Sequence, residues 1–415
     1  MPLLDICAIL LTLAALFGYL NHRFIGLPTT IGIMVITMVI SLATVLLGKL
    51  GVHGGQDTVL AFVGAIDFDD TLMKGMLSFL LFAGALHVDL AELARHRNII
   101  VALATGGVVF TTFAVGTFAW LLFPLLGIPL DYGYCLLFGA LIAPTDPVAV
   151  LSIMRTANVP RSLQTKVAGE SLFNDGVAVV VFLVIAGTVL SGDSVTIASV
   201  AKLFAIEALG GVIYGLSIGW ICFYMLKSVD NYQIEVLLTL ALVMGGYALA
   251  NRLHVSGPLA MVVAGLLIGN RGRRDAMSEQ TREHLDNFWE LIDEILNAVL
   301  FLLIGLEVLA IAGDLRVLAA GLLIIPLVLI ARFVSVGVPV LVLRRFQEFS
   351  AGAVRVLTWG GLRGGISVAL ALSLPTGEVR DLLVTVAYVV VVFSIIVQGL
   401  TIRHVVARVT GAERE

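Results

Sequence analysis

Charged side chains are scarce in this chain. Asp, Glu, Lys and Arg make up 13% of its 415 residues and hydrophobic residues make up 59%, whereas soluble domains carry roughly 25% charged residues. This balance excludes a soluble globular protein. The 25 Lys and Arg residues are scattered rather than gathered in a stripe, so no nucleic-acid partner is expected.

Cysteine is also rare. The 3 cysteines, Cys7, Cys135 and Cys222, lie far apart within apolar segments. No CxxC pair or Cys/His metal spacing occurs, so we expect these residues to pack as small apolar side chains. A His/Glu metal motif and a Gly-x-Ser-x-Gly nucleophile motif are absent as well, which argues against an enzyme. No cofactor is expected.

Long apolar segments dominate what is present. Most are about 20 residues or longer, which suits a helix that crosses a hydrocarbon core about 30 Å thick, whereas barrel strands would be about 10 residues long. The sequence therefore predicts an all-α polytopic membrane protein whose first span is retained. About thirteen spans are expected, at 3–21, 27–48, 72–90, 98–125, 132–155, 164–190, 200–227, 232–250, 256–270, 284–311, 316–343, 351–374 and 380–403.

Basic residues collect in alternate loops between these spans. Because Lys and Arg are enriched on the cytoplasmic side of membrane proteins, we expect the N-terminus outside and the C-terminus in the cytoplasm. Trp289 is expected to anchor its helix at the membrane interface. The basic residues that carry the orientation are Arg23, Arg95, Arg97, Arg155, Arg161, Lys166, Lys227, Arg271, Arg273, Arg274, Arg344, Arg345, Arg403 and Arg408.

Two spans contain helix breakers. Span 132–155 includes Pro144 and Pro147, and each proline removes an N–H donor and clashes with the preceding turn. Span 351–374 includes the glycine-rich segment Gly360–Gly365, where the backbone can leave the helix. The two spans are seven apart in order, which predicts inverted repeats around a linking helix. Broken helices at matching positions of two repeats indicate the substrate site of a transporter.

Few charged residues lie inside the spans. Asp146 and Arg363 lie in the two breaks, Glu170 and Asp175 in span 164–190, and Arg332 in span 316–343. A charged carboxylate at mid-membrane depth costs on the order of 2.5 to 3.5 kcal/mol, so a span retains one mainly where function needs it. Asp175 is therefore the first functional candidate.

A polar stripe surrounds Asp175. Ser171 lies four residues before Asp175, and Glu170 lies four residues before Asn174, so the two pairs form adjoining rows on one helix. A buried arginine needs a carboxylate partner. For Glu170 we prefer Arg332 in that role, with Arg363 as the second choice.

The oxygen donors near the breaks suit a hard cation. The carboxylates of Asp175 and Asp146, the hydroxyls of Ser171 and Thr145, and carbonyls freed by the prolines are all hard ligands, with no Cys or His nearby. Burial disfavours a charged carboxylate, so such a group holds a proton when no cation is bound and releases it when a cation arrives. If Asp175 is the sole carrier, one cation exchanges for one proton.

Five segments in this order and spacing resemble cation/proton antiporters of the NhaP and NHE type, the monovalent cation:proton antiporter-1 family. The resemblance covers almost the whole chain. It is weak for any one segment and specific for the five together, which are Pro144–Ala149 (PTDPVA), Gly169–Gly176 (GESLFNDG), Ser256–Asn270, Ile330–Arg332 and Gly360–Gly365 (GGLRGG).

The resemblance implies a homodimer of the NhaA-like antiporter fold, in which a core domain moves like an elevator against a dimerisation domain. It implies dimerisation-domain helices in 1–95, core helices in 96–195, linking and dimerisation helices in 196–312, core helices in 313–405 and a short cytoplasmic tail at 406–415. This short form implies a prokaryotic inner membrane and no regulation by a long tail.

The family's motifs also imply roles for single residues. Asp175 is implied to bind the cation and the proton, Ser171 to line the site, and Asp146 and Thr145 to lie in the unwound crossing. Asn174 marks the electroneutral branch, since relatives with two aspartates there are typically electrogenic. The implied cargo is Na⁺, with Li⁺ or K⁺ as further candidates, exchanged for H⁺.

Three other function classes are alternatives: a symporter, a channel and an intramembrane enzyme. A sodium-coupled symporter of organic anions with the same fold would need a free arginine and more hydrogen-bonding side chains. A channel would conduct continuously, whereas paired broken helices favour alternating access. An intramembrane enzyme lacks any catalytic motif here.

Overall fold

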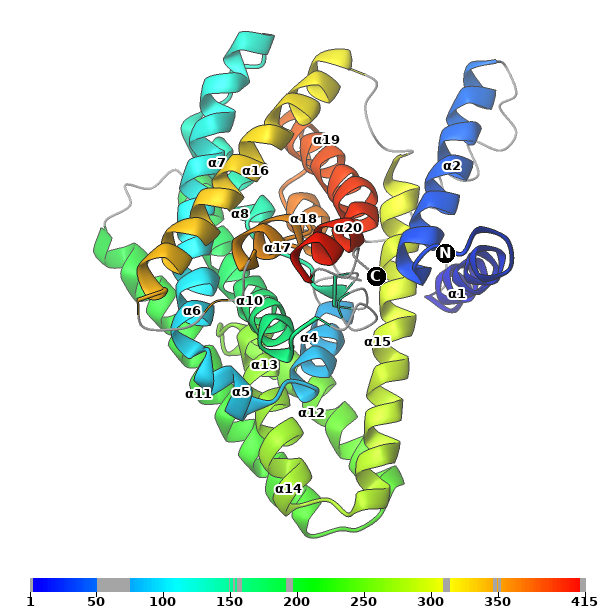
Figure 1. The fold of residues 1–415 in the computed structure, drawn as a ribbon, viewed down its shortest axis with the longest axis vertical. Coiled ribbons are helices and arrows are strands. Elements are labelled where there is room, and N and C mark those ends of the chain that lie inside the picture. The colour runs from blue at the N-terminus through cyan, green and yellow to red at the C-terminus, as the bar shows by residue number, and fades with distance from the viewer. Residues whose placement is uncertain are drawn as a thin grey trace.

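The structure, a computed structural model, describes residues 3–50, 75–148, 150–151, 154, 159–191, 197–308, 314–345, 349 and 352–410. All regular elements in this part of the chain are helical (Figure 1). The α-helices are α1 (Leu3–Leu20), α2 (Thr29–Lys49), α4 (Leu77–Leu86), α5 (Leu90–Arg95), α6 (Arg97–Val101), α7 (Val108–Leu122), α8 (Tyr132–Ile142), α10 (Arg161–Ser191), α11 (Ile197–Lys227), α12 (Tyr232–Arg252), α13 (Gly257–Leu267), α14 (Arg273–Asp275), α15 (Glu279–Glu307), α16 (Leu315–Leu343), α17 (Ala353–Trp359), α18 (Gly365–Leu372), α19 (Glu378–Phe393) and α20 (Gly399–Thr410).

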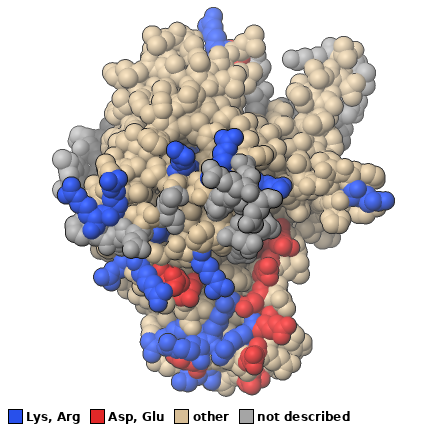
Figure 2. All heavy atoms as spheres, viewed as in Figure 1, with Lys and Arg blue, Asp and Glu red and all other residues tan. Residues whose placement is uncertain are grey.

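The prediction of an all-helical membrane protein is confirmed. Among the described residues, 8 helical segments are long and apolar enough to cross a membrane. Charged side chains are sparse on the upper third of the face in Figure 2 and gather towards the lower end, which carries α14. The number of crossings stays a prediction, because part of the span expected at 72–90 lies outside the described residues.

Two hydrophobic clusters organise the packing. One is formed by α7, α8, α10, α16, α18 and α19, with buried residues such as Phe138, Ile324 and Val386. The other includes α1, α2, α4, α12, α13 and α15, with Phe82, Met261 and Trp289 among its buried residues. The first cluster is drawn from two separate stretches of the chain, which therefore meet in space.

Both predicted helix breaks are confirmed. α8 ends at Ile142, and the backbone is not helical again until Val148. α17 ends at Trp359 and α18 begins at Gly365. The two breaks touch, because Asp146 and Leu362 form an isolated antiparallel bridge. This crossing brings together segments more than 200 residues apart in sequence.

The α7–α8 contact depends on a glycine. A Cβ built on Gly139 would lie 2.0 Å from the carbonyl oxygen of Thr112 and 2.9 Å from the backbone nitrogen of Gly116. Real Cβ atoms do not approach backbone this closely, so the two helices can adopt their spacing only without a side chain at residue 139. α8 is thereby held where its C-terminal end enters the crossing.

Two expectations for single residues are wrong. Trp289 is fully buried instead of lying at an interface: its ring packs 4.8 Å from Phe82 and its Nε1–H donates to Thr239 Oγ1 at 3.1 Å. Lys166, expected in a loop, is buried in α10 with its ammonium 4.7 Å from the centre of the Phe349 ring. In both cases the apolar body of a long side chain fills the interior.

We predict that Gly139→Ala lowers the free energy of unfolding by about 1 to 3 kcal/mol, the usual cost of overpacking. Gly245→Ala is the control, since nothing lies within 4 Å of a Cβ at residue 245 of α12, and alanine favours a helix over glycine. Thermal unfolding of the purified protein measures both. Equal melting temperatures for the two variants would contradict the close α7–α8 contact.

Candidate ion-binding site

The predicted polar stripe lies in the middle of α10. Glu170, Ser171, Asn174 and Asp175 are all buried. α10 runs without a break from Arg161 to Ser191, so residues four apart lie one above the other on its surface. The stripe faces the break after α8, as the hydrogen bonds of Asn174 show.

Asn174 ties this break to α10. Its Oδ1 accepts from the backbone N–H of Thr145 at 3.3 Å, and its Nδ2 donates to Thr145 Oγ1 at 2.7 Å. Thr145 Oγ1 also shares a hydrogen bond of 3.0 Å with Ser171 Oγ. Buried backbone groups that leave a helix need such partners. The neutral amide at residue 174 therefore positions the break, and it can do so because it both donates and accepts.

Asp146 holds the other side of the crossing. Its backbone N–H donates to the carbonyl of Leu362 at 2.8 Å, and its Oδ1 accepts from the N–H of Val148 at 2.9 Å, where the helix resumes. A Cβ on Gly364 would lie 2.5 Å from Asp146 Oδ2, so the carboxylate packs directly on the second break. A carboxylate at a helix N-terminus is stabilised in its charged form.

Asp175 has an oxygen without a partner. The residue is 7% exposed, and its buried Oδ1 makes no hydrogen bond. An unpartnered carboxylate oxygen in the interior is unfavourable unless a proton or a cation satisfies it. The described residues contain no group of three or more His, Cys, Asp and Glu side chains that could hold a metal ion. The neighbouring side chains Ser171 and Thr145 carry hydroxyl oxygens, which are hard ligands.

Glu170 forms its ion pair with Arg332. Both Oε atoms take part: Nη1 of Arg332 donates to Oε1, and Nη2 donates to Oε2 at 3.0 Å. Nη2 also donates to the carbonyl of Leu357 at 2.9 Å. A Cβ on Gly361 would lie 2.4 Å from Arg332 Nε, so the glycine admits the guanidinium. The pair joins α10, α16 and α17 beside the crossing.

Arg363 has a different role from the one considered for it. Its Nη1 donates to the carbonyls of Ala143 and Pro144, at 2.8 and 3.0 Å, and its backbone N–H donates to Ser394 Oγ at 2.8 Å. These carbonyls are the ones that α8 leaves without partners where it ends. The guanidinium, which is 2% exposed, thus balances the negative end of the α8 dipole.

The comparisons with known proteins identify the family. A model of the family described as "Sodium/hydrogen exchanger, transmembrane" matches residues 11–408. The chain belongs to the sodium/hydrogen exchanger family. The exchanger chain is 52% identical over 415 residues to the Na⁺/H⁺ antiporter NhaP of Pseudomonas aeruginosa, and the match covers 99% of this chain and 98% of that protein.

Two further matches agree with this assignment. The Na⁺/H⁺ antiporter NhaH of Halobacillus dabanensis is 35% identical over 347 residues, which cover 82% of the exchanger chain and 83% of that protein. The structure of the sodium proton antiporter MjNhaP1 from Methanocaldococcus jannaschii at pH 8 matches with a TM-score of 0.76 and 19% identity, over 99% of this chain and all of that one. The latter match shows a shared fold, as expected from the broken helices.

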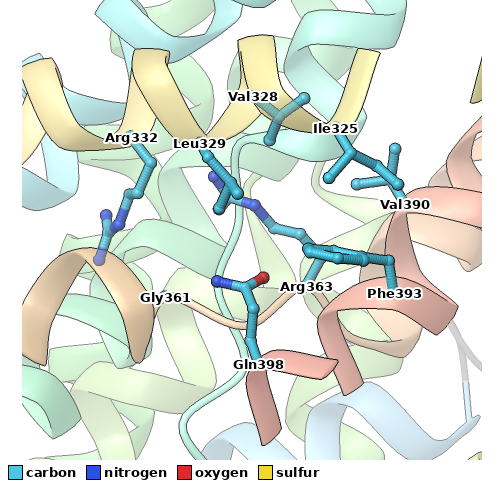
Figure 3. Close-up of a pocket in the computed structure, with 9 residues that line it drawn as sticks. All are labelled: Ile325, Val328, Leu329, Arg332, Gly361, Arg363, Val390, Phe393 and Gln398. Carbon is cyan, nitrogen blue, oxygen red and sulfur yellow. The ribbon is translucent and has the colours of Figure 1, made fainter. Parts of the chain in front are cut away.

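A small cavity in the exchanger lies beside the crossing, away from Asp175. Figure 3 shows that both arginines and Gln398 line it among apolar side chains. Gln398 accepts from Ser394 Oγ at 2.7 Å and donates to the carbonyl of Trp359 at 3.1 Å. The cavity therefore belongs to the support of the crossing rather than to the carboxylate site.

Sequence reasoning missed part of this support. Ser394 and Gln398 fix Arg363 and the end of α17, and their spacing of four in an apolar span was the available signal. It also missed Glu235, a buried acid in α12. Glu235 lies inside the predicted span 232–250, and an acid within a span was the available signal.

We predict that Glu170→Gln lowers the free energy of unfolding by about 3 to 5 kcal/mol, because it leaves Arg332 as an unpaired buried charge. Glu92→Gln is the matched control: Glu92 pairs with Arg95 at 2.7 Å, but Arg95 is exposed and Glu92 only half-buried, and pairs near the surface contribute about 0 to 1 kcal/mol. Unfolding of the purified variants measures both. The double variant Glu170→Gln/Arg332→Gln should lose less than the sum of the single variants, and additive losses would contradict the pairing.

Proposed function

We propose that this protein exchanges one sodium ion for one proton across the membrane, and that both ions compete for the carboxylate of Asp175. The observation that carries the proposal is the buried, unpartnered Oδ1 of Asp175 at the crossing of two broken helices. Membership of the sodium/hydrogen exchanger family and the antiporter names of its relatives support the same reaction. Li⁺ and K⁺ are further candidate cargoes.

The charges around Asp175 support an electroneutral cycle. Asp146 accepts a backbone N–H at a helix start, and Arg363 donates to carbonyls at a helix end, so helix dipoles stabilise both charges throughout the cycle. Glu170 and Arg332 neutralise each other. Asp175 is then the one carrier. It is neutral when protonated and forms a neutral pair with Na⁺, whereas the empty carboxylate is charged and costly to move through a low-dielectric barrier.

We further propose an elevator-type movement of α7, α8, α10, α16, α18 and α19, which share one hydrophobic cluster, against the remaining helices. The site lies on the first group, while α15 and α13 of the second group face it. We further propose a homodimer in a cell membrane, with the N-terminus outside. The organic-anion symporter gains no support, because Arg332 is paired and Arg363 is engaged with backbone carbonyls.

We predict that Asp175→Asn abolishes cation-dependent proton flux while the protein still folds, because the amide cannot exchange a proton for a cation. Flux is measured with a pH-sensitive dye in proteoliposomes that carry a pH gradient, after addition of Na⁺, Li⁺ or K⁺. Asp131→Asn, a change of the same kind at an exposed residue, is the control and should retain exchange. Substantial flux in Asp175→Asn would remove Asp175 from the role of carrier.

We also predict that an imposed membrane potential leaves the exchange equilibrium unchanged, since one cation exchanges for one proton. Proteoliposomes with a potassium diffusion potential and opposing Na⁺ and H⁺ gradients measure the balance point at which net flux is zero. A balance point that moves with the potential would show electrogenic exchange and would contradict the single-carrier stoichiometry.

A further inference from the structure

Glu235 is a buried acid far from the ion-binding site in the fold. It lies in the first turn of α12 and is 0% exposed, and both of its carboxyl oxygens lack a hydrogen-bond partner. Among the described residues, Asp175 is the other acid with a buried oxygen that makes no hydrogen bond. The exchange mechanism at the crossing makes no use of Glu235.

Among the described residues of the helices packed on α12, none gives Glu235 a compensating positive charge. α12 packs against α4, α11, α13 and α15, and neither α4 nor α13 contains a charged residue. Lys227 at the end of α11 is exposed. On α15, Arg282 donates to the carbonyl of Met277 at 3.1 Å, while Glu283 and His284 are exposed. The acid Asp230 is the charged group that acts on Glu235.

A polar route links Glu235 to the surface. Thr281, in the first turn of α15, is the side chain that faces the Glu235 carboxyl. Its hydroxyl donates to Asp230 Oδ1 at 3.5 Å, and its Oγ1 accepts from Ser278 Oγ–H at 3.2 Å. Asp230 is exposed in the short loop between α11 and α12, and this loop lies at the end of the molecule that carries α14 (Figure 1). Hydroxyl and carboxylate groups in this order can pass a proton between water and a buried acid.

We propose that Glu235 is a second proton-binding site, reached from the α14 face through Asp230 and Thr281, and that its charge controls how α15 packs on α12. A buried carboxylate beside Asp230 whose oxygens make no hydrogen bond and meet no cation is strongly disfavoured. The packing seen here therefore contains the neutral acid. Loss of the proton places a charge in the α12–α15 contact and separates the two helices at this end.

The same helix face connects this contact to the transport machinery. Thr239, one turn after Glu235, accepts from Trp289 Nε1 of α15 at 3.1 Å. Further along α15, Leu300 packs on the start of α18, where a Cβ on Gly365 would lie 2.4 Å from a Leu300 methyl carbon. α15 thus spans from the proton site to the crossing. The proton at Glu235 regulates exchange through the position of α15, without binding the transported cation.

The first test compares melting temperatures of the full-length wild type and Glu235→Gln between about pH 5 and about pH 9. Glutamine keeps the shape of the side chain but carries no charge. The melting temperature of the variant should therefore exceed that of wild type by a few degrees as pH rises, because folded wild type must keep a proton that the unfolded chain releases. Glu283→Gln, at an exposed residue of α15, should show no pH-dependent difference. A constant difference for Glu235→Gln would overturn the proposal.

The second test observes the proton on Glu235 directly, by infrared spectroscopy, and does not depend on a difference in stability. The infrared spectrum of wild type at about neutral pH should contain a protonated-carboxyl band that Glu235→Gln lacks, and that disappears when wild type is titrated to higher pH. Absence of this band would overturn the proposal. Both tests are repeated in the Asp175→Asn background, where the Glu235 effects should persist even if Asp175 proves not to be the carrier.

The regulatory role has its own readout. The pH dependence of dye-reported exchange in proteoliposomes should differ between wild type and Glu235→Gln, whereas the apparent Na⁺ affinity at low pH should agree within about twofold. Identical pH profiles would overturn the regulatory role, and a large loss of Na⁺ affinity at all pH values would show that Glu235 acts on the ion site instead.

Discussion

The crossing of two broken helices is the constraint on which the rest of this structure depends. Each break leaves backbone N–H and C=O groups without helical partners in an apolar interior, and such groups are costly unless they are paired. Asn174 and Thr145 satisfy part of the first break, the Asp146–Leu362 bridge joins it to the second, and Arg363 caps the end of α8. The polar residues beside Asp175 are thus needed for folding before they are needed for transport.

This arrangement separates fixed charges from the exchangeable one. Arg363 and Asp146 each interact with a helix end of opposite polarity, and Glu170 pairs with Arg332. Asp175 has a free oxygen and no fixed positive partner. A site of this kind can change its occupant without rebuilding its surroundings, which is what competition between a cation and a proton requires. Glu235 likewise has carboxyl oxygens without a hydrogen bond, but it lies where the exchange mechanism places no transported ion.

Much of the fold could be predicted because apolar length and helix breakers act locally. Hydropathy gave the positions of the helices to within a few residues, and Pro144, Pro147 and the Gly360–Gly365 segment marked both breaks. The burial of Lys166 and Trp289 could not be predicted, because it depends on which other segments pack against these positions. The support of Arg363 by Ser394 was missed for the same reason.

The sequence by itself determined that the chain is an all-helical membrane protein with a few intramembrane charges, since the cost of burying charge is a property of each residue. Only the tertiary structure decided how those charges are partnered. Arg332 and Arg363 were both available to Glu170, yet Arg332 forms the pair and Arg363 turns to the carbonyls of Ala143 and Pro144. The physical reason is that pairing depends on distances between helices that are 160 or more residues apart in the chain, and these distances exist only once the helices have packed.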